Sequence, residues 1–204
     1  MSIFRALALL ALCSGCVSLE KAYPDKRYFV LEASPKVDPA NPTANETLQV
    51  SNIRVSPRYA DRSFIYRISA AGYESDFYNQ FLVSPASLIT EEVRKGLIGS
   101  QLFKYVISPS SPLQPSYVLD GTVNALYGDF RESDSPRAVL EMEFFLTSDI
   151  PAKPGILVQK RYGKSIPLSA RSPEALVKAW NQALEMILTD LVADLKAVTV
   201  KDSS

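Results

Sequence analysis

The first sixteen residues determine where a fold can begin in this chain. Arg5 supplies a positive charge, and the apolar run over residues 6–12 is too short to cross a bilayer as a helix. Small residues at 14–15, Ser and Gly, then precede Cys16. This is the pattern of a lipoprotein signal, because small residues leave room for a peptidase and the cysteine thiol accepts diacylglycerol. We therefore expect residues 1–15 to be removed and Cys16 to become an acylated N-terminus.

Two other interpretations of this segment are open. Cleavage before Cys13 would leave the bulky Leu12 at the scissile bond, so Cys16 is the preferred site. An ordinary secretory signal would leave Cys16 as an incidental, unmodified cysteine. The residue after Cys16 is Val17 and not Asp, which in lipoproteins of this type implies export to the outer membrane.

Acylation would attach the protein to a membrane without spanning it. Each buried CH₂ contributes about 0.8 kcal/mol, so a diacylglyceryl thioether with an amide-linked chain, such as palmitate, makes a durable anchor. Later apolar stretches are interrupted by charge within a few positions. We expect a lipid-anchored domain on the periplasmic face of the outer membrane.

Composition limits the chemistry of the domain. The 22 basic and 22 acidic residues balance, so bulk charge recruits no nucleic acid. Both cysteines lie in the signal or at the anchor, so we expect the mature fold to have no disulfide. The hydrophobic core must then stabilise the fold without a covalent crosslink. Apolar residues make up 47% of the chain, enough for one domain with a substantial core.

The chain contains no histidine, which removes Ser-His-Asp triads, Cys-His pairs and His-based metal sites. The scattered glycines form no phosphate-binding loop. Three carboxylate pairs remain as acid/base candidates: Glu91 with Glu92, Glu141 with Glu143, and Asp190 with Asp194. Glu141 and Glu143 alternate with apolar residues, as on the solvent face of a half-buried strand. We expect neither an enzyme nor a bound cofactor or metal.

Apolar periodicity indicates a single α+β domain. The expected strands are 26–31, 48–55, 63–68, 72–77, 105–107, 117–130, 138–148 and 156–166. A helix should begin at Pro85, capped by Ser84, and end near residue 102. A second should begin near Pro173 and place Trp180 in the core. Together, these elements predict a mixed or antiparallel sheet with two helices packed on one face.

The domain organisation follows from these elements. We expect a signal peptide at 1–15, a lipidated tether at 16–25, one periplasmic domain at 26–199 and a disordered tail at 200–204.

Aromatic residues and arginines alternate between residues 59 and 81, and both types are enriched at the centres of protein interfaces. We expect most of these rings to pack in the sheet, with Phe64 and Tyr66 on one strand face and Phe77 in the core. Arg62 and Tyr78 are the candidates for surface groups that mediate self-association or partner binding.

The mature chain resembles the ABC-type transport auxiliary lipoproteins, the PqiC-like group. The residues that carry the resemblance are Tyr28-Phe29-Val30-Leu31, Val50, Val55-Ser56-Pro57, Tyr59-Ala60-Asp61-Arg62, Ile65-Tyr66-Arg67, the aromatic stretch at 73–81, Pro85, Leu88, Leu97, Ser100, Phe103 and Tyr117-Val118-Leu119-Asp120-Gly121. One departure is Phe81, where the family usually has Trp, so any hydrogen bond of that indole is lost.

The resemblance implies a fold like the N-terminal domain of TolB. It also implies a role beside an ABC transporter and a mammalian-cell-entry (MCE) domain protein, in moving lipid or other hydrophobic molecules between membranes and so maintaining membrane integrity. The first hypothesis is a docking subunit that binds a conduit protein, with a homo-oligomer as a further expectation. The second is a lipid carrier with its own apolar pocket, and the third is a structural envelope lipoprotein with no transported ligand.

Overall fold

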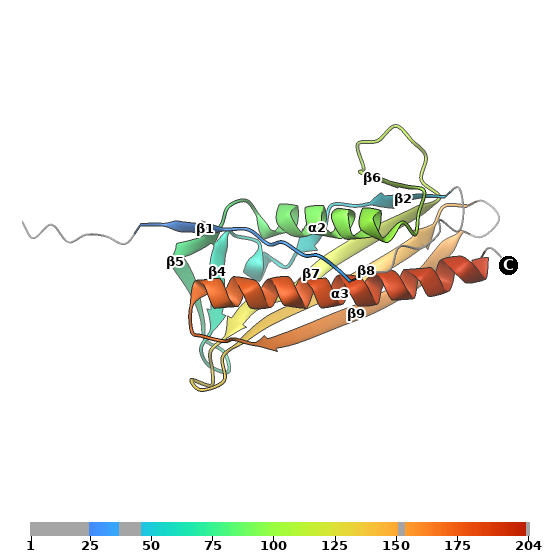
Figure 1. The fold of residues 1–204 in the computed structure, drawn as a ribbon. Helices are drawn as coiled ribbons and strands as arrows, with labels where there is room; N and C mark the ends of the chain where they lie inside the picture. The colour runs from blue at the N-terminus through green and yellow to red at the C-terminus, as the bar shows by residue number, and fades with distance from the viewer. Residues whose placement is uncertain (1–24, 37–45, 151–153, 203–204) are drawn as a thin grey trace, which may run out of the picture.

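The computed structural model describes residues 25–36, 46–150 and 154–202, with side chains through residue 198. The expected signal peptide, Cys16 and residues 16–24 of the tether lie outside the described residues. Within the described residues the α+β prediction is confirmed: a mixed sheet carries two long helices on one of its faces (Figure 1).

The long strand β7 (Tyr117–Asp129) organises the sheet. On one edge it pairs antiparallel with β8 (Arg137–Ser148), and β8 pairs antiparallel with β9 (Gly155–Pro167), so the three long strands predicted over 117–166 form a meander. Gly121 of β7 leaves room for Phe144, since a Cβ there would lie 2.9 Å from its ring. Inward-facing residues of β8 are fully buried, whereas Glu141 and Glu143 stay partly exposed on the other face, as the alternation predicts.

The other edge of β7 is shared by three short parallel strands. These are β2 (Thr47–Val50), β3 (Arg54–Val55) and β4 (Ser63–Arg67), which pair in series along its length. The single strand predicted over 48–55 is therefore wrong in detail. It breaks after Val50 because Ile53 turns into the core, and its amide donates to Thr90 Oγ1 at 2.9 Å instead of to β7.

Short strands complete both margins of the sheet. β6 (Tyr105–Ile107) pairs with β2, while β5 (Tyr73–Phe81) pairs with β4 and with β1 (Arg27–Phe29). β4 and β5 correspond to the strands predicted over 63–68 and 72–77 and form an antiparallel hairpin, although β5 runs four residues past the predicted end at residue 77. A 3-10 turn, η1 (Pro57–Tyr59), precedes β4.

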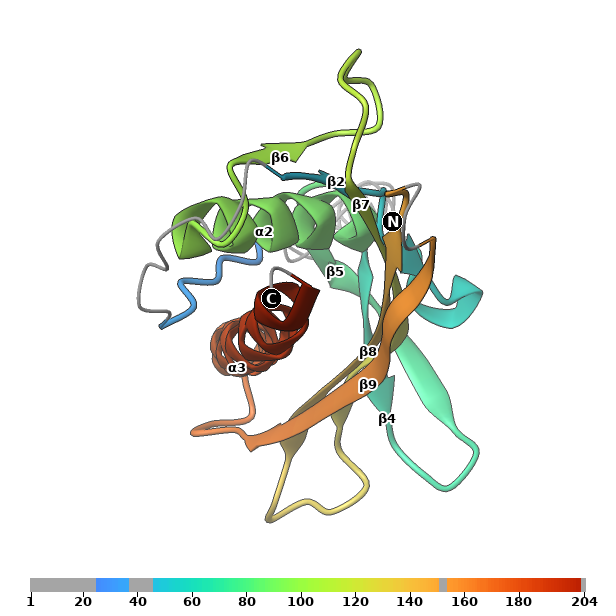
Figure 2. The same ribbon diagram turned by 90° about the vertical axis from the view of Figure 1, so that its right-hand side faces the viewer.

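The two helices lie side by side in the hollow of the curved sheet (Figure 2). α2 (Pro85–Ser100) begins as predicted, since Ser84 Oγ accepts from the Ser87 amide at 3.2 Å. It ends where Gln101 adopts φ 53°, a left-handed cap.

The second helix, α3 (Pro173–Asp202), starts where the sequence predicts but runs farther. Residues 200–202, expected in the disordered tail, continue the helix because no glycine or proline follows Pro173. No helix among the described residues has both the length and the apolar character needed to cross a membrane.

Trp180 anchors α3 to the sheet. Its indole is fully buried and packs edge-on against Phe64 of β4 at 5.1 Å and obliquely against Phe81 of β5 at 5.6 Å between ring centroids. Its Nε1–H donates to the Val139 carbonyl of β8 at 3.3 Å. The prediction of a core tryptophan is confirmed, and Phe81 fills an aromatic position in the same cluster.

Replacing this indole should cost much of the stability of the domain. We expect Trp180→Ala to lower the free energy of unfolding by about 3–5 kcal/mol, because a cavity opens between α3 and the sheet. The measurement is urea unfolding followed by circular dichroism. Met186→Ala, a truncation of a partly exposed side chain on the same helix, serves as control and should leave the midpoint nearly unchanged. An unchanged midpoint for Trp180→Ala would contradict the burial.

Candidate docking surface

The β4–β5 hairpin is interrupted by a bulge on β5. Ile65 pairs with Ser75, but the next pair is Ser63 with Gln80. Between these two pairs, β4 spans two residue steps and β5 spans five. Three residues of β5 therefore have no partner on β4. The extra residues fall in the segment 76–79, which lies at the end of the molecule where β1 joins the sheet (Figure 1).

The carboxylate of Asp76 holds the bulge in shape. Its Oδ1 accepts the backbone amides of Tyr78 at 2.8 Å and Asn79 at 3.0 Å. Its Oδ2 accepts the Asn79 side-chain amide at 2.6 Å and the Tyr66 hydroxyl of β4 at 2.8 Å. Burial by itself raises the pKa of Asp76, but these hydrogen bonds outweigh it and the pKa lies below its usual value of 3.8. The site is therefore built around an ionised Asp76.

The same Tyr66 hydroxyl is held in its neutral form. Burial, and then the hydrogen bond to Asp76, raise the pKa of Tyr66 well above its ordinary value, so it remains a donor at neutral pH.

The bulge turns Phe77 outward, so the prediction of Phe77 in the core is wrong. The side chain is 63% exposed because Asp76, by accepting the amides of Tyr78 and Asn79, holds a bulge that breaks the alternation on which that prediction depended. Phe77 packs edge-on against Tyr78 at 5.3 Å, and Lys26 Nζ lies 4.1 Å from its ring centroid.

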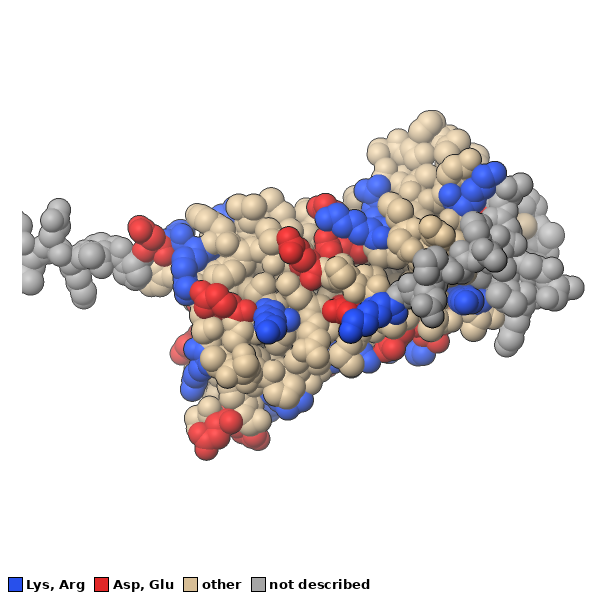
Figure 3. All heavy atoms as spheres, viewed as in Figure 1, with Lys and Arg blue, Asp and Glu red and all other residues tan. Residues whose placement is uncertain are grey.

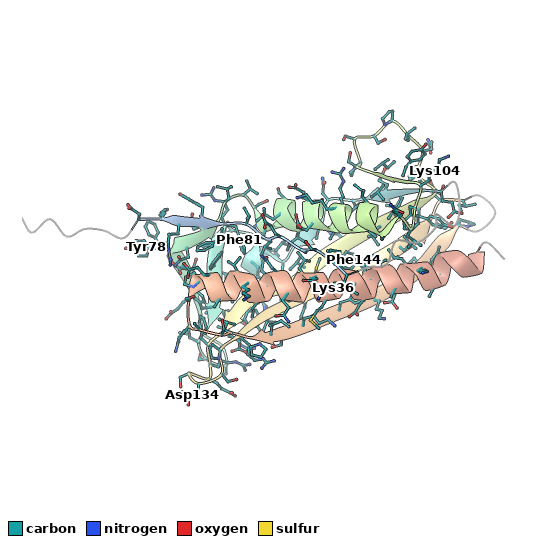
Figure 4. All side chains as sticks on the ribbon, in the orientation of Figure 1. Lys36, Tyr78, Phe81, Lys104, Asp134 and Phe144 are labelled. Atoms are coloured by element: carbon teal, nitrogen blue, oxygen red, sulfur yellow. The ribbon has the colours of Figure 1, made fainter. Side chains whose placement is uncertain are left out.

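The two predicted interface residues lie at this end of the fold. Tyr78 is half-buried beside Phe77, and Figure 4 shows it at the margin of the molecule. Arg62 is exposed, and it donates from Nη1 to the Leu82 carbonyl at 3.1 Å and from Nη2 to Gln80 at 3.3 Å. Its guanidinium lies 5.6 Å from the Tyr28 ring centroid. Arg62 and Tyr78 thus lie near the same end of the fold but have different neighbours, Tyr28 for Arg62 and Phe77 for Tyr78.

Most other rings of the segment pack as expected. Phe64 and Phe81 are buried, and Tyr59 stacks on Tyr127 with ring centroids 5.9 Å apart. Burial, followed by the neighbouring Tyr73, raises the pKa of Tyr59 to about 12. Sequence reasoning missed the exposed Tyr28 and Phe77, because strand alternation gives no sign of a bulge. The only local signal is an Asp followed three residues later by Asn, a pattern typical of turns.

Five of the six candidate carboxylates make ion pairs, and the sixth, Glu141, is partly exposed on β8. Lys95 pairs with both Glu91 and Glu92, and Glu92 also accepts the Ala33 amide at 2.7 Å.

On the sheet and α3 the partners are separate basic side chains. Glu143 pairs with Arg161, Asp190 with Lys164, and Asp194 with Lys160. The two aspartate pairs connect α3 to β9, and the Glu143 pair connects β8 to β9, so these carboxylates have structural partners.

The larger surface hollows have mixed linings. One of about 670 Å³ lies at the β4–β5 hairpin and includes Arg58, Arg67 and Glu74 beside Tyr59 and Tyr73. Another, of about 700 Å³, runs along α3 and is lined mainly by polar side chains. Figure 3 shows acidic and basic side chains interspersed over the helix-bearing face. Both hollows open on the surface of the protein.

Comparison with known proteins supports the fold. No family model matches the sequence, and no curated protein matches it. Among solved structures, XCC0632 of Xanthomonas campestris, a DUF330 protein, superposes with a TM-score of 0.75 at 16% identity, over 87% of this chain and 99% of that one. An uncharacterised protein superposes with a TM-score of 0.67 at 17% identity, over 84% and 99%.

The hypothetical protein CT253 of Chlamydia trachomatis superposes with a TM-score of 0.53 at 10% identity, over 76% of this chain and 98% of that one. The chain therefore has a fold already seen in proteins of this size, including a DUF330 protein.

Charge on Asp76 should stabilise the fold in a pH-dependent way. We expect Asp76→Asn to be less stable than wild type by about 1–2 kcal/mol at pH 7, since hydrogen bonds to a carboxylate are lost. Because the folded-state pKa is depressed, this contribution is complete above the unfolded-state pKa near 4 and disappears as pH falls below it. The two urea midpoints should therefore converge below pH 4.

Asp134→Asn is the matched control, since Asp134 is an exposed turn carboxylate (Figure 4). Its midpoint should follow that of wild type at every pH. A constant gap between Asp76→Asn and wild type from pH 7 to pH 3 would contradict the role of an ionised Asp76.

Proposed function

We propose that this protein is a lipoprotein, anchored through Cys16 to the periplasmic face of the outer membrane, and that it docks an ABC/MCE-type system that moves lipid between membranes. The observation that carries the docking role is the exposed Arg62, whose guanidinium is held by the Leu82 carbonyl and Gln80 at the end of the fold where Tyr78 lies half-buried in the bulge. An arginine fixed in this way by hydrogen bonds is a preorganised contact group. The fold shared with a DUF330 protein and the resemblance to PqiC-like lipoproteins support the assignment.

The position of this surface fits an anchored subunit. The first described residue, Asp25, leads directly into β1, which pairs with β5 next to the bulge. An anchor confines the domain to a thin layer, so a weak contact gains from a high effective concentration of partner. A conduit that reaches the outer membrane would meet the anchored end of the domain.

Binding without catalysis is the role that the residues favour. The chain has no histidine, and five of the six carboxylates considered for acid/base work pair with lysine or arginine side chains. We therefore propose a docking subunit that performs no chemical step and needs no metal or cofactor.

The lipid-carrier alternative receives less support. A carrier needs an apolar pocket of several hundred Å³ that shields an acyl chain from water. The described hollows of that size are open and carry charged residues, and the side chains between helices and sheet are closely packed around Trp180. A structural envelope lipoprotein with no transported ligand would share the anchor and the fold, and it differs only in its partner.

Acylation is tested at the cysteine itself. We expect Cys16→Ser to abolish incorporation of a palmitate analogue and to move the protein from the detergent phase to the aqueous phase, because the thioether cannot form. Cys13→Ser is the matched control and should label as wild type does. Retained labelling in Cys16→Ser, or loss of labelling in Cys13→Ser, would contradict the assignment.

Partner docking is tested by charge reversal at the bulge surface. We expect Arg62→Glu to reduce recovery of an MCE-domain protein from crosslinked membranes about tenfold, equivalent to about 1.4 kcal/mol, because a guanidinium next to aromatic rings becomes a carboxylate. Arg161→Glu on β9 is the control, since Arg161 makes only a surface pair of 3.4 Å. Thermal unfolding confirms that both variants fold.

One outcome would contradict docking through this surface: an acylated, folded Arg62→Glu protein that retains wild-type oligomeric state, partner recovery and envelope-barrier complementation. Recovery of an unrelated envelope complex by the wild type, with no MCE protein, would favour the structural alternative.

A further inference from the structure

The outer face of β1 carries an apolar stripe at the point where the tether enters the fold. Tyr28 and Val30 are 49% and 38% exposed, whereas Phe29 and Leu31, which alternate with them, face the core. Lys26 lies two residues before Tyr28 and therefore belongs to the same face. Its Nζ lies 4.1 Å from the ring centroid of the exposed Phe77. We call the group Lys26, Tyr28, Val30 and Phe77 the tether corner.

The length of the tether limits what can cover this corner. Nine residue steps separate Cys16 from Asp25, so the chain between them spans at most about 30 Å when fully extended. Asp25 adjoins Lys26, and hydrogen bonding of β1 to β5 fixes the corner rigidly to the domain. An acylated Cys16 would therefore hold the corner, more than any other part of the fold, close to the lipid surface.

The chemistry of the corner matches the polar layer of a bilayer. Tyrosine is enriched at the membrane–water interface, where an apolar ring and a polar hydroxyl are both accommodated. A lysine can extend its ammonium toward phosphate while its methylenes stay among apolar groups. The acidic residues Asp25 and Asp61 lie near Lys26 and Arg62 in the sequence, so the local charge is balanced and attraction to anionic lipid is not the main force.

We propose that the tether corner rests in the phospholipid headgroup layer of the membrane that holds the anchor. The proposal depends on the acylation of Cys16 proposed above. It gives the domain a fixed orientation, with the β1–β5 end on the membrane and the end bearing β6 projecting away from it. Arg62 and Tyr78, at the margin of the corner, remain available to a protein that reaches the membrane surface.

The mature protein allows a direct test, since its sole natural cysteine would be acylated. The full chain is produced with Phe77→Cys, labelled on the new thiol with an environment-sensitive fluorophore, and reconstituted into phosphatidylcholine vesicles that contain headgroup-nitroxide lipid. Ile156→Cys is the matched control, because Ile156 is 64% exposed and Phe77 63%.

The control lies at the other end of the fold. Ile156 pairs with Thr147, near the C-terminal end of β8. The opposite end of β8, at Arg137, follows the turn that contains Asp134. Figure 4 places Asp134 and Tyr78 at one end of the molecule and Lys104 at the other.

We expect the probe at residue 77 to shift to shorter emission wavelength and to be quenched by the nitroxide several-fold more than the probe at 156. Balanced charge predicts that moderate salt changes this quenching little. Equal, water-like signals from both probes on protein that floats with the vesicles would overturn the proposal while leaving the anchor intact. A shift at 77 that occurs without vesicles, or only after a partner protein is added, would also overturn it. Protein that fails to float would instead contradict acylation.

Discussion

Hydrogen bonding along the two edges of β7 is the interaction on which the rest of the structure depends. One edge is occupied along its length by β8, and the other is divided among β2, β3 and β4. Because three parallel strands share one partner, the segments between them must leave the sheet and return. Those departures place Ile53 in the core against α2 and position β4 to begin the hairpin that ends in the bulge.

The packing of α3 depends on the same arrangement. β4, β5 and β8 bring Phe64, Phe81 and the Val139 carbonyl around a single indole. Large aromatic surfaces buried in this way contribute strongly to stability, and the sequence after Cys16 contains no cysteine that could add a disulfide. The buried Phe81 of the aromatic cluster and the exposed Phe77 of the bulge both belong to β5, so one strand contributes to the core and to the exposed surface.

The bulge joins stability to the proposed function. Asp76 accepts hydrogen bonds from two backbone amides and two side chains. These bonds fix a backbone shape that strand pairing alone would not produce. The result is an exposed phenylalanine next to the tether, at the end of the domain that an acylated cysteine would hold near lipid. An irregularity of this kind at the margin of a sheet is a common way to redirect a side chain toward a ligand.

The sequence by itself determined the elements whose signals are local. Pro85 after Ser84, the apolar stripe through Trp180, and the alternation from Leu140 to Leu146 were enough to place both helices and the meander, because propensity, capping and periodicity act over a few residues. The prediction of a lipoprotein signal before Cys16 also depends on local features only. Only the tertiary structure decided that 48–55 divides into two strands and that Phe77 points outward. The first outcome depends on a partner distant in the chain, Thr90 for Ile53. The second depends on the hydrogen bonds that Asp76 accepts from the Tyr78 and Asn79 amides and from Tyr66 on the paired strand. Hydrogen bonds of either kind leave no periodic trace in the sequence.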